Sequence, residues 1–448
     1  MRIKLIQPVM MKRPMDTKLK TRMSPSLALL TIANLTPKAH EVITLNENVE
    51  KIDFNEAVDL VAITVTVDGM NRAVEISKEF QSRGVTVIAG GIHITADPEG
   101  AVNSFDAISV GMAERVWTKI LKDKENNSLK KIYYDMDNIS GSEIVSPNYN
   151  IIDKSKYLYT NIISTSRGCP YQCDFCYNSC NNVLKTYINR PVKDVIKDIN
   201  ALKTRHIMFI DDNFIGNPNW TKELLKEIKP RKLKWNAAVT SNIVDMPELL
   251  DEMKEAGCQS LFIGFESINS KSLESVHKVQ NSVNRYEKLV KELHKRGIMI
   301  NASFVFGLDE DDASIFKSTL DWIVKNKIET VTSHILTPYP GTKLYKTLLA
   351  ENRIVDFNLT SYNTANVVYR PKSMTAEELY NGYLWIYKEL YTLKNIMKRL
   401  PESRKQWVPF LTFNFFYRKF GKLTELLCNI ISFKNVGRFS RWLAYRIK

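Results

Sequence analysis

The feature that most constrains this chain of 448 residues is a run of three cysteines within eight residues. Cys169, Cys173 and Cys176 are spaced C-x3-C-x2-C. Thiolates are soft ligands that favour iron–sulfur clusters and zinc. Three thiolates are too few to close a four-iron cluster, so one iron would stay open to a molecule from outside the chain. The spacing therefore predicts a cluster with one open position.

A fourth cysteine, Cys180, follows after three further residues. Four thiolates could close a structural zinc site or an electron-transfer cluster, which is the alternative interpretation. Zinc sites of the finger or ribbon type usually pair two separated C-x2-C knuckles, and this sequence has no second knuckle. Cys258 and Cys428 are isolated, as is typical of small buried apolar residues.

The segment around these cysteines, Arg167–Asn178 (RGCPYQCDFCYN), resembles the cluster motif of the radical S-adenosylmethionine (SAM) superfamily. The match includes the aromatic Phe175 just before the last cysteine, a position that the resemblance places beside SAM. It implies a [4Fe-4S] cluster on Cys169, Cys173 and Cys176, with SAM chelated at the open iron. It also implies that reductive cleavage of SAM releases a 5′-deoxyadenosyl radical that abstracts hydrogen from a substrate.

Charge and composition describe an ordinary globular chain with one unusual end. The net charge is +14, and residues 395–448 contain 12 Lys and Arg against two acids. The rest of the chain is close to neutral, so a general nucleic-acid-binding surface is not indicated. No run reaches the length of a membrane-spanning helix, the start lacks a signal-peptide core, and the cysteine usage fits a reducing cytoplasm.

Strand and helix patterns alternate over residues 1–125. Leu60–Thr66 and Val85–Ala89 are β-branched and apolar, as buried parallel strands are, and Asn71–Gln81 has the spacing of an amphipathic helix. This alternation predicts an open, doubly wound α/β sheet of the Rossmann-like kind. Ligands of such sheets bind at the carboxyl ends of the strands.

This unit resembles the cobalamin-binding domain that precedes the barrel in one branch of the radical SAM superfamily. The matching stretches are 25–30 (PSLALL), 90–93 (GGIH) and 111–114 (GMAE). The D-x-H-x-x-G pattern is absent, so cobalt would have no histidine from that motif. The alternative is a unit that has lost its ligand and only packs on the barrel. Cobalamin contacts are expected at Thr64, Val65, Thr66, Gly90, Gly91, Gly111 and Glu114.

Residues 126–155 are rich in Lys, Asn, Asp and Ser and are interpreted as a linker. Strand and helix patterns alternate again over residues 156–350. Repeated βα units with right-handed crossovers predict a parallel barrel, and six units leave it partly open, as the barrel of the superfamily is. The six strands are expected at 159–164, 206–210, 233–239, 260–264, 299–306 and 329–336.

The predicted barrel strands end in groups suited to SAM. Asp211, Asp212 and Asn213 follow the second strand, where carboxylates and an amide can hold the cationic amino group of SAM. The superfamily usually has a G-G-E-like motif here, so which of the three makes the contact stays open, and a turn with a helix cap is the alternative. The other expected SAM contacts, after strands four to six, are Glu266, Ser267, Phe306, Gly307 and Pro338.

Two side chains near the end of the sixth strand are candidates for contact with substrate. His334 lies near the end of that strand, and Tyr339 follows in a P-x-P-G-T segment that resembles the same branch. The other histidines of the barrel lack metal-ligand spacing and are interpreted as structural. The catalytic residue itself is not identified by the sequence.

Residues 351–448 are expected to form a mainly helical extension with a basic and aromatic tail. A helix is predicted at 374–393, capped by Thr375. Aromatic side chains with Lys and Arg suit a membrane interface. They could also pack on the barrel, or pair with nucleic acid, and we rank the three in that order.

Taken together, the motifs predict a cobalamin-dependent radical SAM enzyme. The expected reaction is methylation of an unactivated carbon of a small-molecule or lipid-like substrate, with a flavodoxin or ferredoxin as electron donor. The alternatives are radical chemistry without cobalamin, such as dehydration, epimerisation, cyclisation or carbon–carbon bond formation, or a non-enzymatic metal-binding or tethering protein. The expected location is the cytoplasm, with peripheral attachment to a membrane through the tail.

Overall fold

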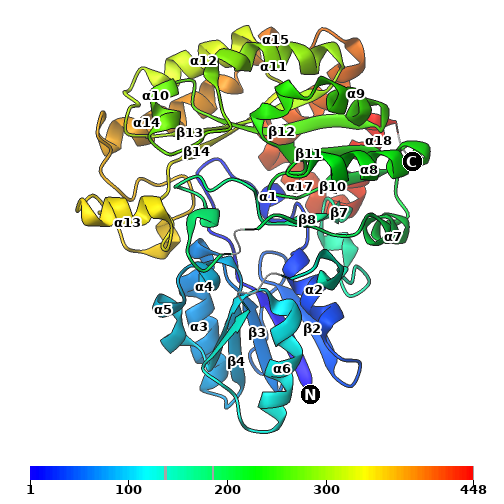
Figure 1. The fold of residues 1–448 in the computed structure, drawn as a ribbon, viewed down its shortest axis with the longest axis vertical. Coiled ribbons are helices and arrows are strands. Elements are labelled where there is room, and N and C mark those ends of the chain that lie inside the picture. The colour runs from blue at the N-terminus through cyan, green and yellow to red at the C-terminus, as the bar shows by residue number, and fades with distance from the viewer. Residues whose placement is uncertain (136–138, 184–185, 447–448) are drawn as a thin grey trace.

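The computed structural model describes residues 1–135, 139–183 and 186–446 and contains two separate six-stranded parallel sheets. Figure 1 shows the first sheet below and the second above, with the C-terminal helices beside the second. The expected α/β class, with a Rossmann-like unit before a partial barrel, is confirmed. Because the strands of each sheet are parallel, each sheet carries the carboxyl ends of its strands at a single edge.

The N-terminal sheet has the strand order β2-β1-β3-β4-β5-β6. All its neighbouring strands run parallel, which places their carboxyl ends at one edge. The strands are β1 (Arg2–Gln7), β2 (Glu41–Asn46), β3 (Leu60–Thr64), β4 (Thr86–Gly90), β5 (Ala107–Gly111) and β6 (Ile132–Asp135).

Strand β6 lies inside the segment that we expected to be a linker. Its pattern IYYD buries Tyr133 and Asp135 and pairs with β5, so a short strand was hidden by its polar surroundings. Four residues are too few for a strong periodicity signal. We propose that the first structural unit extends to the end of β6 rather than stopping near residue 125.

Helices cover both faces of this sheet, which is why its strands are apolar throughout. On one face, α3 (Met70–Gln81) buries Met70, Ile76 and Phe80 against the sheet. On the other face, α2 (Leu27–Leu35) and α6 (Ala113–Glu125) pack together. Shorter helices follow β1 and β4: α1 (Lys18–Thr21), α4 (Ile92–Ala96) and α5 (Pro98–Ala101).

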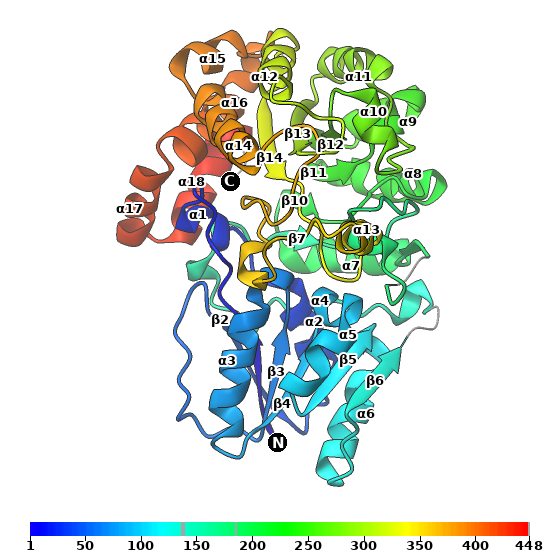
Figure 2. The same cartoon turned by 90° about the vertical axis from the view of Figure 1, so that its left-hand side faces the viewer.

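The second sheet has the order β14-β13-β12-β11-β10-β7, so each strand lies beside the next one in the chain. This is the arrangement of an open barrel, and Figure 2 shows the strands following one another in an arc. The strands are β7 (Ile162–Ile163), β10 (His206–Phe209), β11 (Lys234–Val239), β12 (Cys258–Glu266), β13 (Met299–Phe306) and β14 (Thr330–Ile335). The six predicted barrel strands are therefore all present.

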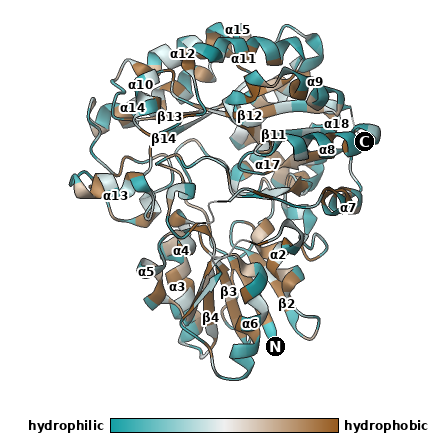
Figure 3. Ribbon diagram, viewed as in Figure 1, coloured by the Kyte–Doolittle hydropathy of each residue, from teal (hydrophilic) through white to brown (hydrophobic). Residues whose placement is uncertain are grey.

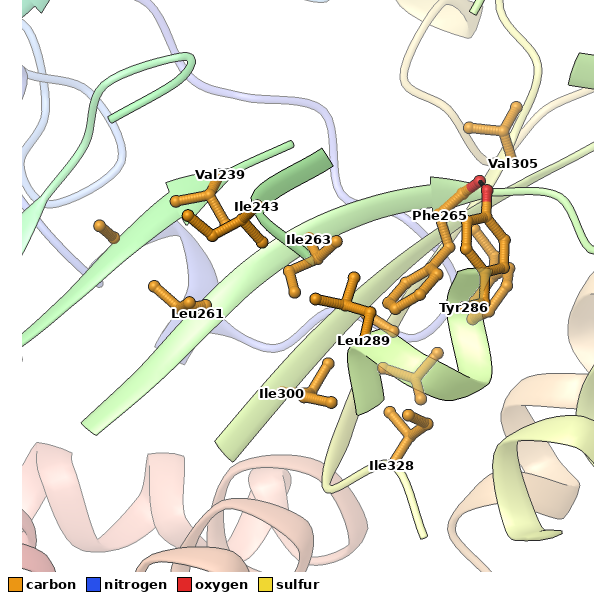
Figure 4. Close-up of a cluster of buried hydrophobic side chains, with 14 of the residues drawn as sticks. Val239, Ile243, Leu261, Ile263, Phe265, Tyr286, Leu289, Ile300, Val305 and Ile328 are labelled. Atoms are coloured by element: carbon orange, nitrogen blue, oxygen red, sulfur yellow. Dashed lines mark hydrogen bonds between the residues drawn. The ribbon is translucent and has the colours of Figure 1, made fainter. Parts of the chain in front are cut away.

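The outer face of the barrel packs against helices that follow each strand. Figure 4 shows Leu261, Ile263 and Phe265 of β12 packed against Tyr286 and Leu289. Figure 3 shows apolar residues concentrated in the strands and on the inner helix faces. The helices are α7 (Val192–Leu202), α8 (Pro218–Ile228), α9 (Pro247–Glu255), α10 (Ser270–Glu274), α11 (Val283–Lys295), α12 (Ile315–Lys325) and α13 (Lys343–Ala350).

The C-terminal extension is helical, as predicted. Its first helix, α14 (Ala376–Leu390), begins at the expected cap Thr375, which forms a capping box with Glu378. The remaining helices are α15 (Leu393–Lys398), α16 (Trp407–Leu411), a π-helical turn over Thr412–Lys419, α17 (Gly421–Ile431) and α18 (Phe433–Tyr445). Among the described residues, no helix combines the length and apolarity needed to cross a bilayer.

Candidate active site

The three cysteines lie on a loop between two short antiparallel strands, β8 (Ser166–Arg167) and β9 (Ile188–Asn189). The loop begins at Gly168, whose φ of 75° is a conformation that other residues rarely adopt. It turns back between the last two cysteines, because the Cys176 amide donates a hydrogen bond of 2.9 Å to the Cys173 carbonyl. Cys173 is buried, and Cys169 and Cys176 are half-buried.

The thiols of Cys169 and Cys176 resist ionisation unless a cation joins them. Burial raises the pKa of Cys176 to about 12, and Asp212 and the other two thiols add to that effect. The pKa of Cys169 is raised by burial, by Asp212 and by Cys173. Because metal ligation needs thiolates, the iron atoms of a cluster would supply the missing positive charge. The site therefore fits a cationic cluster bound by all three sulfurs.

Cys180 faces away from this trio. Its side chain is buried against Ala96 and Val183, beside Tyr177, and the charges that act on its pKa are Lys346 and Asp97 rather than the other cysteines. In the described parts of the chain, no three His, Cys, Asp or Glu side chains converge as the ligands of one metal ion would. A four-iron cluster needs its thiolates spread apart, because each thiolate binds a different iron atom. The position of Cys180 argues against a site closed by four thiolates.

The residues after β10 divide into two roles. The Asp211 carboxylate accepts hydrogen bonds from the Thr165 and Ser166 amides, at 2.6 and 2.7 Å, and from both their hydroxyls. A carboxylate has about four acceptor positions, so Asp211 is committed to holding the entrance of the cluster loop. The residue pattern does not reveal this commitment. We propose that Asp211 positions the cluster loop rather than binding SAM.

The next two residues face the cluster loop more freely. Asp212 acts electrostatically on Cys169 and Cys176, and burial together with Asp211 raises its own pKa. Asn213 is buried, and its side-chain oxygen has no hydrogen-bond partner in the part of the chain that the structure describes. A buried amide oxygen without a partner is costly unless a ligand completes it. We propose that the contact with SAM is made by Asp212 and Asn213.

Glu266 ends β12 in a left-handed conformation, with φ of 63°. This is rare for a residue with a side chain and is often found at functional sites. Its carboxylate forms a buried ion pair of 2.5 Å with Lys278, whose ammonium also lies 5.6 Å from the centre of the Phe175 ring. Lys278 was not predicted, because nothing in its sequence surroundings distinguishes it from a surface lysine. Ser267, the next residue after Glu266, is buried as well.

Two predicted SAM contacts lie behind the site instead. The Phe306 ring packs on Phe316, 4.8 Å between centres, in the outer core. The Gly307 carbonyl accepts a hydrogen bond from Tyr369, and a methyl group at Gly307 would meet both Tyr369 and Leu379. The C-terminal extension therefore covers Gly307, which the sequence could not reveal because Tyr369 and Leu379 lie more than 60 positions away in the chain. Pro338 is buried as well.

The two candidate catalytic side chains are held by protein contacts. His334 accepts at Nδ1 from Arg13, at 3.4 Å, and lies 3.0 Å from the Thr364 hydroxyl. Burial, with Arg13 and other cations, lowers the pKa of His334 to about 3, so it is neutral at pH 7. Tyr339 stacks on Tyr177, 4.9 Å between ring centres. Neither side chain is charged at neutral pH, and both remain candidates for substrate contact only.

A cavity of about 410 Å³ joins the N-terminal sheet to the cluster loop. Thr64, Gly90, Gly91, Gly111 and Glu114 line it, as expected for ligand contacts at the carboxyl ends of β3, β4 and β5. The other two predicted residues do not. The Val65 amide bonds to the Gly90 carbonyl, and the exposed Thr66 hydroxyl donates to Asp68.

The opposite wall of this cavity comes from the cluster loop and the end of β10. Arg167, Gly168, Asn178 and Asp212 line it. Arg167 crosses to Glu114 with an ion pair of 3.7 Å, which links the two sheets at the cavity. Deep in the cavity, the buried Ser109 hydroxyl has no partner among the described residues. The cavity is thus largely apolar, bordered by the cluster loop and supplied with a few polar groups, as cofactor sites are.

Comparison with protein families gives two matches. Residues 163–323 match the model of the radical SAM superfamily. Residues 342–441 match a domain of unknown function, DUF4070. The first match ends before the last barrel strand and the second begins after it, so the second covers α13, the helical extension and most of the tail.

Individual proteins resemble the chain over most of its length. It is 30% identical, over 88% of this chain and 89% of the other, to bacteriochlorophyllide d C-12(1)-methyltransferase of Chlorobaculum tepidum. Its fold resembles that of the cobalamin-dependent SAM radical enzyme OxsB, with a TM-score of 0.69 at 16% identity over 98% of this chain and 74% of the other. It also resembles the radical SAM methyltransferase TsrM of Kitasatospora setae, with a TM-score of 0.62 at 17% identity over 78% of each chain.

These likenesses span the whole architecture described above. They include the three cysteines on one loop, the open barrel and the Rossmann-like sheet that faces them. The chain therefore belongs to the radical SAM superfamily, in the branch that carries a cobalamin-binding-type domain before its barrel.

Proposed function

We propose that this protein is a cobalamin-dependent radical SAM methyltransferase that acts on an unactivated carbon of a hydrophobic small molecule. The observation that carries the proposal is the cavity shared by the strand ends of the N-terminal sheet and the cluster loop. When bound, the cluster and SAM supply the radical that removes hydrogen, and cobalamin supplies the methyl group. The relative that methylates bacteriochlorophyllide d supports methyl transfer over other radical reactions.

The chain's own residues have separate tasks in this proposal. Cys169, Cys173 and Cys176 hold the cluster and leave one iron for SAM. Glu114 and Arg167 fix the distance between the two cofactor regions through their ion pair. The glycines at the ends of β4 and β5 keep the cavity free of side chains, so that a large planar ligand can approach the backbone.

Anaerobic reconstitution of the full chain tests this function. Protein loaded with iron, sulfide and cobalamin should bind cobalamin stoichiometrically, and after reduction it should convert SAM to 5′-deoxyadenosine. With a lipophilic acceptor it should also form methylated product. Deoxyadenosine formation without bound corrin would favour the cobalamin-free alternatives, and the absence of SAM cleavage would favour a non-enzymatic role. Flavodoxin and ferredoxin are the proposed physiological reductants, to be compared with dithionite.

The tail supports a further part of this proposal, peripheral attachment to an anionic membrane. Helix α17 exposes apolar side chains at i, i+3, i+4 and i+7 spacing, the pattern of an interfacial helix. We call this set the α17 ridge: Leu423, Leu426, Leu427, Ile430 and Ile431. Ile430 is 76% exposed, and an exposed ridge of this size suggests a partner surface. The tail's excess of Lys and Arg complements anionic headgroups.

Substituting serine at Leu426 and Ile430 together should reduce binding to liposomes. Two such side chains contribute roughly 3–6 kcal/mol if fully buried in the interface, so flotation with phosphatidylglycerol-containing vesicles should largely disappear. The matched control replaces the exposed Leu349 and Val355, outside the tail, by serine. Equal flotation of both double variants would contradict the membrane role of the ridge. Point variants are preferable to truncation at Pro401, because the removed segment contacts the barrel through Asn414 and Tyr445.

A further inference from the structure

The barrel contains a second cavity of about 510 Å³, separate from the one described above. One wall is the inner face of the barrel sheet, from β10 to β14, and the other is the C-terminal tail. Figures 1 and 2 both show α18 close to the strands of this sheet, and Figure 2 shows α17 farther out. We call this space the tail chamber. None of the residues predicted to bind SAM or cobalamin lines it, except Asp211 at its upper end.

The sheet wall presents apolar side chains that nothing in the described parts of the protein covers fully. Strand residues alternate between the two faces, so the neighbours of the buried Leu261 and Ile263 point inward. Phe262 among them is 36% exposed, and Ile210 at the end of β10 is 42% exposed. Both line the chamber. Large apolar groups that face a cavity favour an apolar occupant, because covering them removes their surface from water.

The tail wall is aromatic and is built by an irregular helix. The π-helical turn at 412–419 brings Phe413, Phe416 and Tyr417 to the chamber, and Phe416 is 54% exposed. Such turns are rare and occur frequently at functional sites. From α18, the small residues Ser440 and Ala444 line the chamber and leave space for an occupant. The tail is therefore both a surface helix and a wall of the barrel interior.

The floor of the chamber is polar and carries one positive charge. Tyr159, His206, Asn236 and Ser260 form a hydrogen-bonded row across the base of the strands. Burial, with Arg441, lowers the pKa of His206 to about 3, so His206 is uncharged. Arg441 lies over the Tyr159 ring, 4.9 Å from its centre, and donates to the Leu158 carbonyl.

Arg441 is half-buried and differs from Arg13, Arg190 and Arg353, which are buried and pair with carboxylates. In residues 1–135, 139–183 and 186–446, no carboxylate lies within 4.0 Å of its guanidinium nitrogens. A partly buried guanidinium is more stable when an anion completes its hydrogen bonds, and a carboxylate does so in a bidentate manner. The chamber thus has apolar walls that suit an apolar ligand. At its floor, Arg441 provides a place for an acidic group.

The upper end of the chamber reaches the reaction centre. Ile210 and Asp211 line the chamber, whereas the next residue, Asp212, lines the cavity of the cluster loop. The two cavities therefore meet on opposite sides of one short segment after β10. A molecule that fills the chamber from its floor upward would place its far end beside that segment.

We propose that the tail chamber binds the body of the substrate, an amphiphile with a long apolar skeleton and a carboxylate that pairs with Arg441. That the occupant is the substrate rests on the proposed function. The carboxylate lies at the floor, the skeleton lies between Phe262 and the tail aromatics, and the reacting end lies near Asp211. The chamber selects its substrate by length, apolarity and acidic end.

Equilibrium binding of cis-parinaric acid tests the chamber without requiring catalysis. This long-chain polyene acid becomes fluorescent in an apolar site, and the full-length, cluster-loaded protein should bind it. Ala444→Trp or Ser440→Phe should weaken binding by about tenfold or more, because the added ring occupies space that the probe needs. Arg441→Gln should weaken binding of the acid by about tenfold and leave binding of its methyl ester unchanged.

The controls are matched in chemistry and lie outside the chamber. Ala201→Trp is on the exposed side of α7, and Arg404→Gln is an exposed arginine of the tail. Both should bind the probe as the unaltered protein does. Cleavage of SAM by each variant reports whether the fold and cluster are intact.

Failure of this inference can be distinguished from failure of the proposed function. If the chamber-filling variants, still able to cleave SAM, bind the acid as tightly as the controls, the tail chamber is not its site. If Arg441→Gln weakens acid and ester equally, the acidic end is not recognised there. If binding responds as expected but no methylated product forms with any acceptor, the chamber stands and the methyltransferase proposal fails.

Discussion

Replacing Cys169, Cys173 or Cys176 singly by alanine is expected to abolish SAM cleavage. Each sulfur would be the sole protein ligand of one iron, and loss of one would leave the cluster with two thiolates and two open positions. Such a cluster would be exposed to solvent and would have no defined site for SAM. Activity should fall by roughly three orders of magnitude or more, as it does when one member of a cooperating set is removed.

The measurement is deoxyadenosine formation, together with iron content and the visible absorption of the cluster after anaerobic reconstitution. Cys180→Ala is the matched control, because its buried side chain packs on Ala96 and Val183 and faces away from the trio. That variant should keep its cluster and its activity. Loss of the cluster in Cys180→Ala, with retention in Cys169→Ala, would contradict this assignment of the ligands.

The parts that the sequence predicts well are those in which chemistry and spacing lie within a few residues. The cluster loop is one such part, since eight residues contain all three sulfurs. The barrel strands are another, because each is an apolar run of ordinary length between helical patterns. Glycines at the ends of β4 and β5 lie at the cavity edge as expected, since the carboxyl ends of parallel strands share one edge.

The parts that it predicts poorly depend on partners far away in the chain. Asp211 has the residue type of a SAM ligand, but its carboxylate is occupied by residues 164–166. Gly307 has the freedom to approach adenine, but Tyr369 and Leu379 cover it. Lys278 became significant only when the fold placed it against Glu266. In each case the deciding contact is a tertiary one that no local pattern encodes.

The tail shows why composition alone leaves a function open. Its aromatic and basic residues are compatible with a membrane surface, packing on the barrel or nucleic acid. In the structure, packing on the barrel and an exposed apolar surface coexist on different faces. Phe413 and Tyr417 turn toward the barrel, and the α17 ridge faces outward. One face of a helix can pack on the barrel while another face is exposed, so a single segment can have both functions.

Substituting phenylalanine at Ala62 is expected to remove cobalamin binding while sparing SAM cleavage. Ala62 lies in the middle of β3, half-buried, and lines the deep part of the cavity under the cluster loop. A phenyl group there occupies space that a ligand needs but that the protein leaves empty, so the fold should tolerate it. A cost of about 1–3 kcal/mol for overpacking would weaken cobalamin binding by roughly tenfold to a hundredfold.

This variant separates the two cofactor regions because Ala62 lies on a strand of the N-terminal sheet, whereas the cysteines lie on a loop of the barrel. Ala62 therefore borders the cavity only on the side of the N-terminal sheet. Cobalamin content and methylated product should fall together, whereas deoxyadenosine should still form. Ala57→Phe, at an exposed position before the same strand, is the control and should leave all three unchanged. If Ala62→Phe keeps both its corrin and its methyl transfer, cobalamin is not bound in this cavity. If Ala62→Phe loses SAM cleavage as well, a change confined to the N-terminal sheet has reached the cluster. The two sites would then be coupled by more than the Glu114–Arg167 ion pair.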